Sequence, residues 1–235
     1  MPTDSQPELD RIRDEYQRRE RELPVDFYAL TRPVNLFFQQ SRERALQSVL
    51  NTSQMVPLTD RKILDVGCGQ GNWLAMFEAF GAKRSSLSGI ELDAARAKLA
   101  ADRFPGADIR AGNAGELPWP DQSFDIVLQS MVFTSVLDDA VRRKIAVEMQ
   151  RVVRPKGYIV WYDFFYNNPN NAHVRAVKKA ELAALFPEWK LTLRRITLAP
   201  PLARRIVSWS WPLAAMLERF RLFNTHYFGT LQRRT

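Results

Sequence analysis

Three glycines form the part of this sequence whose residue types and spacing most clearly indicate chemistry. Gly67, Gly69 and Gly71 follow the apolar run 63–66, and helical spacing begins at Trp73. A strand, a glycine turn and a helix in this order make a cradle for a nucleotide. Glycine lets a ligand approach bare backbone, and the start of the helix offers free N–H groups. A glycine-rich turn that binds nothing is the simpler alternative.

The spacing of the glycines distinguishes between the known classes of nucleotide-binding turn. Dinucleotide-binding turns have the pattern G-x-G-x-x-G, whereas this turn is G-x-G-x-G and is preceded by Asp65. No lysine of the P-loop type follows, which excludes a P-loop. Glu91 lies 20 residues beyond Gly71, where an acidic side chain binds ribose hydroxyls in nucleotide-binding βαβ units. A solvated strand end is the alternative for Glu91, and the upstream turn favours the ribose role.

The elements that must position this turn alternate along the chain. Helical spacing and apolar runs predict strands at 63–66, 87–93, 107–111, 123–130 and 158–162, and helices at 8–22, 34–50, 71–80, 94–103 and 138–152. Such alternation predicts a doubly wound α/β sheet with right-handed crossovers. The stretch Arg154–Gly157 predicts a turn before the fifth strand. In the tail we expect a short helix at 178–186, strands at 189–198 and 224–232, and a basic, apolar insertion at 200–223.

Length and composition set the class of protein. The 235 residues, 46% hydrophobic and 26% charged, suit one globular α/β domain with additions. The first residues have no apolar run, so we expect no signal peptide, and the run Ile206–Leu217 is too short to span a bilayer. Cys68 is the only cysteine, which excludes a disulfide framework and a Cys/His metal cluster. We therefore expect no metal, and a reducing cytoplasm is the simplest location.

The positive charge is concentrated in the C-terminal part of the chain. The formal net charge is +8, and from Arg194 onward eight arginines stand against Glu218, a balance of +7. This asymmetry indicates an acidic partner such as a nucleic acid, an anionic membrane or a phosphorylated substrate. A solvated basic surface is an equal alternative. Trp and Arg over an apolar face in 200–223 are typical of a membrane interface, and they equally suit a wall over a small-molecule pocket.

The motifs taken together resemble a known family. The turn with its preceding Asp resembles motif I of class I S-adenosyl-L-methionine (SAM) methyltransferases. Two further stretches resemble the methyltransferase type 11, or ubiquinone-biosynthesis-like, branch of this family. The stretch around the fourth strand is Leu117–Asp121 with Phe124–Asp125, and the stretch before the fifth strand is Arg151–Gly157, in which Lys156 replaces a glycine. The resemblance covers roughly residues 60–165. It implies SAM as cofactor and a Rossmann-like, seven-stranded sheet of order 3-2-1-4-5-7-6, with strand 7 antiparallel and helices on both faces.

The resemblance also implies roles for residues at the matching positions. Gly67, Cys68 and Gly69 are expected along the methionine part of SAM, and Asp65 supports the turn or reaches the ammonium group through water. Cys68 is not expected to be a nucleophile, because a buried cysteine is usually inert. Glu91 is expected to bind the ribose hydroxyls, and Leu92 to pack on the adenine. Asn113, in place of the usual Asp, is expected to accept a hydrogen bond from the adenine amino group, and Ala114 to offer its backbone N–H to the ring. Gln129 is expected to border the sulfonium.

The N-terminal part is expected to cover the site. We expect a helical cap at 1–54 and a methyltransferase domain at 55–235 that contains the helical insertion at about 200–223. Residues 24–38 are expected to close over SAM, with Arg32 or Tyr28 near its carboxylate. A helix packed on the far edge of the sheet is the alternative, and the charged helix at 8–22 is a further candidate for folding over the site.

Methyl transfer is an in-line displacement at carbon, so an enzyme mainly holds donor and acceptor in line. A hydroxyl acceptor also needs a base near its proton. His173, in the loop after the fifth strand, or Asp163, at the end of that strand, is the expected base. The other histidine, His226, falls within the last strand, where a structural role is expected.

The expected reaction is methyl transfer to a small-molecule or lipid-linked glycan acceptor. By analogy with a bacterial branch that the stretches Asn167–Arg175 and Thr225–Gly229 resemble, we expect O-methylation in envelope-glycan or secondary-metabolite biosynthesis. The enzyme is expected in the cytoplasm, with peripheral contact at the inner membrane face. Alternatives are a nucleic-acid or protein methyltransferase, a non-catalytic SAM-binding module, and an oxidoreductase, which the glycine spacing disfavours. Gln129–Val132 replaces the N/D-P-P-Y-type tetrapeptide of amino-group methyltransferases, so a nucleic-acid partner is not favoured.

Overall fold

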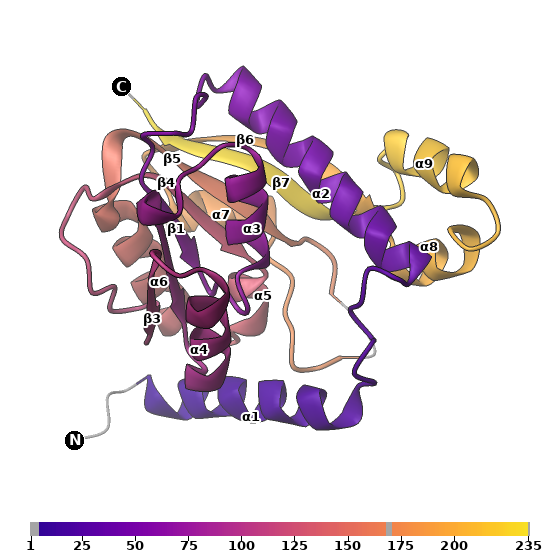
Figure 1. The fold of residues 1–235 in the computed structure, drawn as a ribbon, viewed down its shortest axis with the longest axis horizontal. Coiled ribbons are helices and arrows are strands. Elements are labelled where there is room, and N and C mark those ends of the chain that lie inside the picture. Colours follow the sequence, from indigo (N-terminus) through magenta and orange to yellow (C-terminus); the bar gives the residue numbers. More distant parts are fainter. Residues whose placement is uncertain (1–4, 168–170, 235) are drawn as a thin grey trace.

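Seven strands form one sheet in the order β3-β2-β1-β4-β5-β7-β6 (Figure 1). The computed structural model describes residues 5–167 and 171–234, so residues 1–4 of the expected cap and 168–170 of the loop after the fifth strand lie outside it. The strands are β1 Ile63–Val66, β2 Leu87–Glu91, β3 Asp108–Ala111, β4 Phe124–Ser130, β5 Val153–Phe164, β6 Trp189–Leu198 and β7 Asn224–Arg233. β7 runs antiparallel to β5 and β6, and the other neighbouring strands are parallel. The expected order and orientation are confirmed.

Helices cover both faces of this sheet. The helices are α1 Gln6–Glu22, α2 Pro33–Thr52, α3 Asn72–Ala79, α4 Ala94–Arg103, α5 Val132–Ser135, α6 Asp139–Val152, α7 Lys179–Leu185, α8 Pro200–Ile206 and α9 Trp211–Arg219, with a 3-10 turn at Arg84–Ser86. Side chains of α2, α3 and α4 join one hydrophobic core, and those of α6 and α7 join the core on the opposite face. No helix within the described ranges is both long enough and apolar enough to cross a bilayer.

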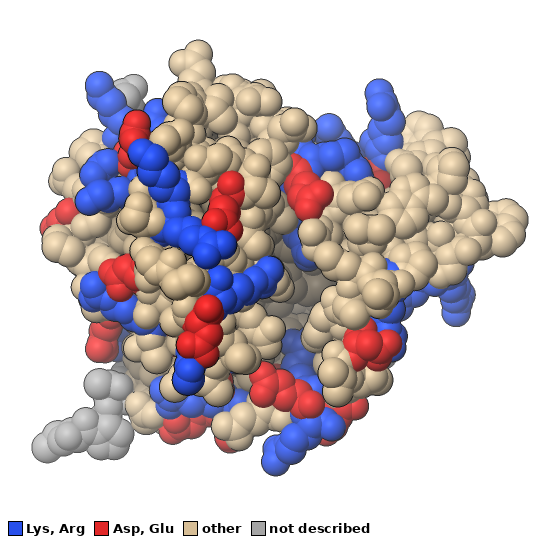
Figure 2. Space-filling model, in the orientation of Figure 1, with Lys and Arg blue, Asp and Glu red and all other residues tan. Residues whose placement is uncertain are grey.

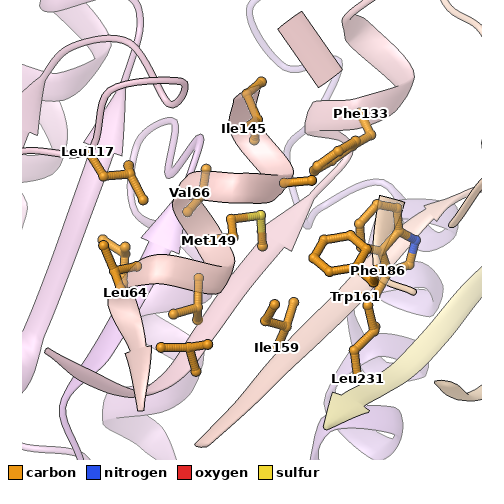
Figure 3. Close-up of a cluster of buried hydrophobic side chains, with 14 of the residues drawn as sticks. Leu64, Val66, Leu117, Phe133, Ile145, Met149, Ile159, Trp161, Phe186 and Leu231 are labelled. Carbon is orange, nitrogen blue, oxygen red and sulfur yellow. The ribbon is translucent and has the colours of Figure 1, made fainter. Parts of the chain in front are cut away.

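The alternation of side chains along β1 explains the two cores. Leu64 and Val66 point to the core beneath α6, near Ile145 and Met149, and the same core continues to Trp161 (Figure 3). Ile63, one residue earlier, belongs to the core on the α3 face. All four residues of β1 are buried, as expected for a central parallel strand that helices cover on both sides.

Side-chain caps fix where two helices begin. Asp93 accepts a hydrogen bond from the N–H of Arg96 at 2.9 Å, and Asp138 accepts one from the N–H of Ala140 at 2.7 Å. Each carboxylate thus satisfies an N–H group that has no partner within its helix. The starts expected for the helices at 94 and 138 are confirmed within one residue.

The prediction of a turn at Arg154–Gly157 is wrong, because β5 already begins at Val153. Pro155 and Gly157 suggested a chain reversal, but this stretch continues the strand beside β4, whose register shifts between Phe124 and Ile126. Arg154 donates to both carboxylate oxygens of Asp125 at 2.8 Å. This ion pair, which joins two strands, holds the beginning of β5 in the extended form.

The segment between β6 and β7 forms a pair of helices that packs on α2. Phe37 of α2 and Trp211 of α9 meet edge to face, with their ring centroids 5.3 Å apart. A small third core surrounds this contact and contains Leu198, Ala203, Val207 and Ala214. Figure 1 shows α8 and α9 as a lobe beside the N-terminal half of α2, outside the sheet.

Candidate functional site

The glycine turn connects β1 to α3 and has an unusual backbone conformation. Gly67 and Gly69 have φ values of +71° and +55°, in the left-handed region that favours glycine. A Cβ atom on Gly67 would lie 2.5 Å from Cγ2 of Val132, and one on Gly69 would lie 2.8 Å from an Nη atom of Arg96. The N–H of Gly67 donates to the carbonyl of Ile90 at 2.8 Å. The positive φ disfavours a side chain at both glycines, Val132 leaves no room for one at Gly67, and β2 holds the turn in place.

Glu91 ends β2 and points back toward this turn. Its carboxylate accepts hydrogen bonds from the N–H of Gly69 at 2.8 Å and from the N–H of Asp93 at 3.1 Å. Only 4% of the residue is exposed. Because a carboxylate has about four acceptor sites, two such bonds leave acceptor capacity for a ligand hydroxyl.

A pocket with about 480 Å³ of empty space opens at the ends of β1, β2 and β3. Five of the ten residues expected to bind the cofactor line it: Gly67, Glu91, Leu92, Asn113 and Ala114. The Oδ1 atom of Asn113 accepts a hydrogen bond from the N–H of Gly115 at 2.9 Å, so one lone pair of this oxygen is already in use. The walls are mostly apolar, with Glu91 as the one carboxylate.

Asp65 lies in β1 directly before the turn and is fully buried. Among the described residues, neither of its carboxylate oxygens has a hydrogen-bond partner. Burial, and secondly the negative charge of Glu91, raise the pKa of Asp65 well above its usual range. An unpaired buried carboxyl group is costly, so this position calls for a cationic or hydrogen-bonding partner from a ligand or a water.

Two further expected residues lie next to the pocket without lining it. Cys68 is buried, and a Cβ on Gly89 of β2 would be 2.8 Å from its sulfur, so the thiol points beneath the turn. Burial raises the pKa of Cys68, which keeps the thiol protonated. Gln129 is fully buried in β4, where its Oε1 accepts from the N–H of Val132 at 3.1 Å. In this structure Gln129 fixes the start of α5.

The two candidate bases have different surroundings. Asp163 is fully buried and accepts hydrogen bonds from the hydroxyl and the N–H of Thr134, and from the N–H of Phe164 at 2.9 Å. Burial raises the pKa of Asp163 to about 7, although these bonds oppose the shift. His173 is exposed, and its Nδ1 lies 3.7 Å from the carboxylate of Glu15 on α1. Asp163 thus holds α5, whereas His173 is open to solvent.

The structure does not bring Arg32 to the pocket. Arg32 forms an ion pair with Asp26 at 2.9 Å in the segment before α2. Tyr28, from the same segment, is 63% exposed and accepts a hydrogen bond from Arg19 at 3.1 Å. Neither Arg32 nor Tyr28 lines the pocket.

The helix that covers the pocket is α1. Leu9, Ile12 and Tyr16 on one of its faces line the pocket, and Ile12 is only 7% exposed. The guanidinium carbon of Arg96 lies 4.5 Å from the ring centroid of Tyr16, a cation–π contact that joins α1 to α4. Sequence reasoning missed these residues as site residues. The available signal was the spacing of Leu9, Ile12 and Tyr16 at i, i+3 and i+7 in an otherwise charged helix.

Polar contacts anchor the beginning of α1 near the start of α6. Glu8 accepts from the N–H groups of Leu137 and Asp138, and Arg11 donates to the carbonyl of Ser135 at 2.6 Å.

His173 and Ser135 line a smaller neighbouring pocket, which shares Ile12 and Tyr16 of α1 with the first. The described residues contain no group of three or more His, Cys, Asp or Glu side chains that suits a metal ion. Figure 1 shows α1 along the edge of the molecule next to α4 and α5.

Comparisons with known proteins point to one kind of domain. Residues 64–161 match a family model described as a methyltransferase domain. The phthiotriol/phenolphthiotriol dimycocerosates methyltransferase of Mycobacterium tuberculosis (strain H37Rv) is 37% identical over 147 residues, which are 62% of this chain and 51% of that protein. The sterol 4-C-methyltransferase strm-1 of Caenorhabditis elegans is 27% identical over 165 residues, 64% of this chain and 47% of that protein. The chain thus spans about half the length of these relatives.

The fold has similar solved structures. An S-adenosylmethionine-dependent methyltransferase from Mesorhizobium loti superposes with a TM-score of 0.57 at 17% identity, covering 81% of this chain and 98% of that chain. At this identity the likeness concerns the fold alone.

Proposed function

Residues 64–161 of this chain form a methyltransferase domain of type 11, and from this premise we propose that the chain is a SAM-dependent methyltransferase. The observation that carries the proposal is the pocket in which the glycine turn, Glu91 and Asn113 meet beneath α1. Fold alone does not define activity, so the proposal depends on whether the residues of this site suit SAM.

Residues of the site suit the ribose, the adenine and the ammonium group of SAM. Glu91 has free acceptor capacity for the ribose hydroxyls, and Leu92 and Ala114 offer apolar contact and backbone to the adenine. The backbone of the turn at Gly67, which lines the pocket, is proposed to lie along the methionine part, with Gly69 continuing the turn. The unpaired oxygens of Asp65 support the turn or reach the ammonium group through a water, and Gln129 is proposed to border the sulfonium near the end of β4. Cys68 contributes its backbone alone.

We propose a hydroxyl group as the methyl acceptor. SAM, when bound, supplies an activated methyl group on a sulfonium. His173 is the proposed base for the acceptor proton, and Glu15 of α1, 3.7 Å from its Nδ1, stabilises the imidazolium that results. Asp163 has its hydrogen bonds directed to Thr134 and Phe164, so we assign it to holding α5. The name of the relative at 37% identity contains "phthiotriol", a word for a compound with hydroxyl groups, and this supports an alcohol acceptor.

The acceptor is a small molecule, and we propose a lipid or a lipid-linked glycan. Support comes from the names of the relatives, which include dimycocerosate lipids and a sterol. Figure 2 shows a hollow between the part of the molecule that carries the sheet and the lobe of α8 and α9. We propose that the acceptor enters through this hollow, in envelope-glycan, lipid or secondary-metabolite biosynthesis. Within the expected cap at 1–54 we assign the covering role to α1, and 55–235 is proposed as the methyltransferase domain with its insertion at about 200–223.

The proposal includes a cytoplasmic location with peripheral contact at the inner membrane face, and no nucleic-acid partner. A protein or nucleic-acid methyltransferase and a SAM-binding module without turnover remain rival functions. The proposed function and these rivals differ in which molecule, if any, becomes methylated. Only the proposed function yields a methylated molecule soluble in organic solvent.

Labelled SAM and a lipid extract test the proposal. The protein, incubated with SAM that carries a deuterated methyl group, is expected to give a labelled lipid or glycolipid in mass spectrometry. His173→Gln is expected to lower the rate by about 10²-fold or more while SAM affinity stays unchanged. Label in nucleic acid or protein, or SAM binding without any labelled product, would contradict the proposed function.

A further inference from the structure

Large apolar side chains that remain exposed are concentrated in two segments of the chain. Twelve such side chains are exposed among the described residues, and eight of them lie within 25–30 and 209–223. These eight, which we call the apolar patch, are Val25, Tyr28, Leu30, Trp209, Met216, Phe220, Leu222 and Phe223. The rest of the described surface contributes only four, so the clustering is not a general property of this surface.

Segment 25–30 lies next to α8, the helix of the lobe that precedes segment 209–223, although more than 170 residues separate them in the sequence. The guanidinium carbon of Arg204 on α8 lies 5.7 Å from the ring centroid of Phe27, which lies in the segment before α2. Phe37 of α2 and Trp211 of α9 anchor the lobe, and both belong to the small third core or pack against it. The members of the apolar patch lie outside this core. Phe220 is 71% exposed and Trp209 is 80% exposed, so the patch is not needed to hold α8 and α9 in place.

Exposed arginines lie on the same lobe as most of the apolar patch, and some of them are its neighbours in the sequence. Arg204, Arg205, Arg219 and Arg221 are exposed on the lobe. The two acidic residues of these segments already have partners, since Asp26 pairs with Arg32 at 2.9 Å and Glu218 pairs with Arg44 at 3.2 Å. Figure 2 shows the lobe as a largely uncharged surface with Lys and Arg at its borders.

We propose that the apolar patch inserts into the headgroup region of an anionic bilayer, while the exposed arginines of the lobe bind the lipid phosphates. Trp, Phe and Leu beside Arg suit this depth, because aromatic rings and arginine both favour the interface between water and hydrocarbon. A second copy of this chain fits less well. A symmetric contact through the patch would place the arginines of one copy against those of the other. The inference deepens the membrane contact of the proposed function, and its test does not depend on turnover.

Insertion makes a different prediction from charge attraction alone. Attraction between arginines and phosphates is screened by salt, whereas burial of apolar side chains persists at high salt. The full chain is therefore expected to co-sediment with vesicles of phosphatidylcholine and phosphatidylglycerol, more weakly but measurably at high salt, and to bind pure phosphatidylcholine poorly. Because Trp209 is the most exposed tryptophan, its emission is expected to shift to shorter wavelength on binding.

Substitution at exposed positions tests the proposal without endangering the fold. The triple variant Trp209→Ser, Phe220→Ser, Leu222→Ser is expected to lower vesicle binding about tenfold or more. Val25→Ser with Leu30→Ser, in the second segment, is also expected to weaken it. The matched control is Leu99→Ser with Val147→Ser, which removes two exposed apolar side chains elsewhere and is expected to leave binding unchanged.

Three outcomes would overturn the inference. They are the absence of binding to anionic vesicles at low salt, equal binding by the triple variant and the control, and a concentration-dependent dimer in light scattering that the triple variant abolishes. The last result would assign the patch to a second copy. None of these readouts involves methyl transfer, so a failed inference leaves the proposed activity standing, and the reverse also holds.

Discussion

The carboxylate of Glu91 accepts a hydrogen bond from the N–H of Gly69 at 2.8 Å, across a separation of 22 residues. This bond ties the end of β2 to the turn that follows β1. It places a buried negative charge in the wall of a mostly apolar pocket. The same carboxylate also accepts from the N–H of Asp93, so its orientation is fixed before any ligand binds.

Replacing Glu91 by Gln is expected to weaken SAM binding by about 1–3 kcal/mol, the range for a hydrogen bond to a charged group. The amide keeps one acceptor oxygen but brings an NH2 group against an N–H donor. Isothermal titration calorimetry measures the change. The exposed Glu188, changed to Gln, serves as the control and is expected to bind SAM like the wild type. Equal affinity of Glu91→Gln and the control would remove Glu91 from the site.

Ile12→Ala is expected to loosen α1 from the pocket. The residue is 7% exposed and lines both pockets, and losing a buried isoleucine side chain costs about 2 kcal/mol or more. Hydrogen exchange is expected to accelerate in 6–22 while β1 and β4 keep their protection. Arg13→Ala, on the solvent side of α1, is the control. Unchanged exchange in Ile12→Ala would show that α1 is not held by this face.

Asp163 is expected to make stability fall as the pH rises. Because burial raises the pKa of Asp163 from 3.8 to about 7, the folded state binds this proton more tightly than the unfolded state. The contribution of the group is thus fully present below about pH 4 and is lost as the pH rises through about 7. Asp163→Asn is expected to flatten the unfolding free energy between pH 5 and 8, with urea titrations as the measurement. An unchanged slope would contradict the shift.

His226 is expected to make the stability of the fold decrease as the pH falls. Burial, and secondly the charge of Arg42, lower the pKa of His226 to about 3 from 6.5, so the folded state holds the neutral ring. Its contribution to stability is present above about pH 6.5 and is lost as the pH falls toward 3. The ring is stacked on Tyr162 with their centroids 4.7 Å apart. His226→Phe keeps this packing and is expected to lower the pH midpoint of acid unfolding, followed by circular dichroism. A raised or unchanged midpoint would argue against a neutral buried ring.

Local patterns predicted the frame of the site well. Gly67, Gly69 and Glu91 meet because a strand, a tight turn and a second parallel strand leave little choice of geometry. Asp93 and Asp138 mark helix starts by a mechanism that acts within three residues. The order of the sheet came from a resemblance of motifs, and the antiparallel β7 agrees with it.

Features that depend on tertiary contacts were harder to predict. The role of α1 depends on Glu8 meeting Leu137, a contact across 129 residues. Arg32 was expected near the carboxylate of SAM, but Asp26 lies six residues before it and forms the local pair. The start of β5 was missed because proline and glycine signal turns, whereas the pair of Arg154 with Asp125 keeps this stretch extended.

The central claim is that the pocket between the glycine turn and α1 binds SAM and not a dinucleotide. Calorimetric titration of the full chain with SAM and, in parallel, with NAD tests it most directly. We expect one SAM bound per chain and no heat of binding for NAD. Saturable binding of NAD, or the absence of any binding of SAM by the folded protein, would contradict it.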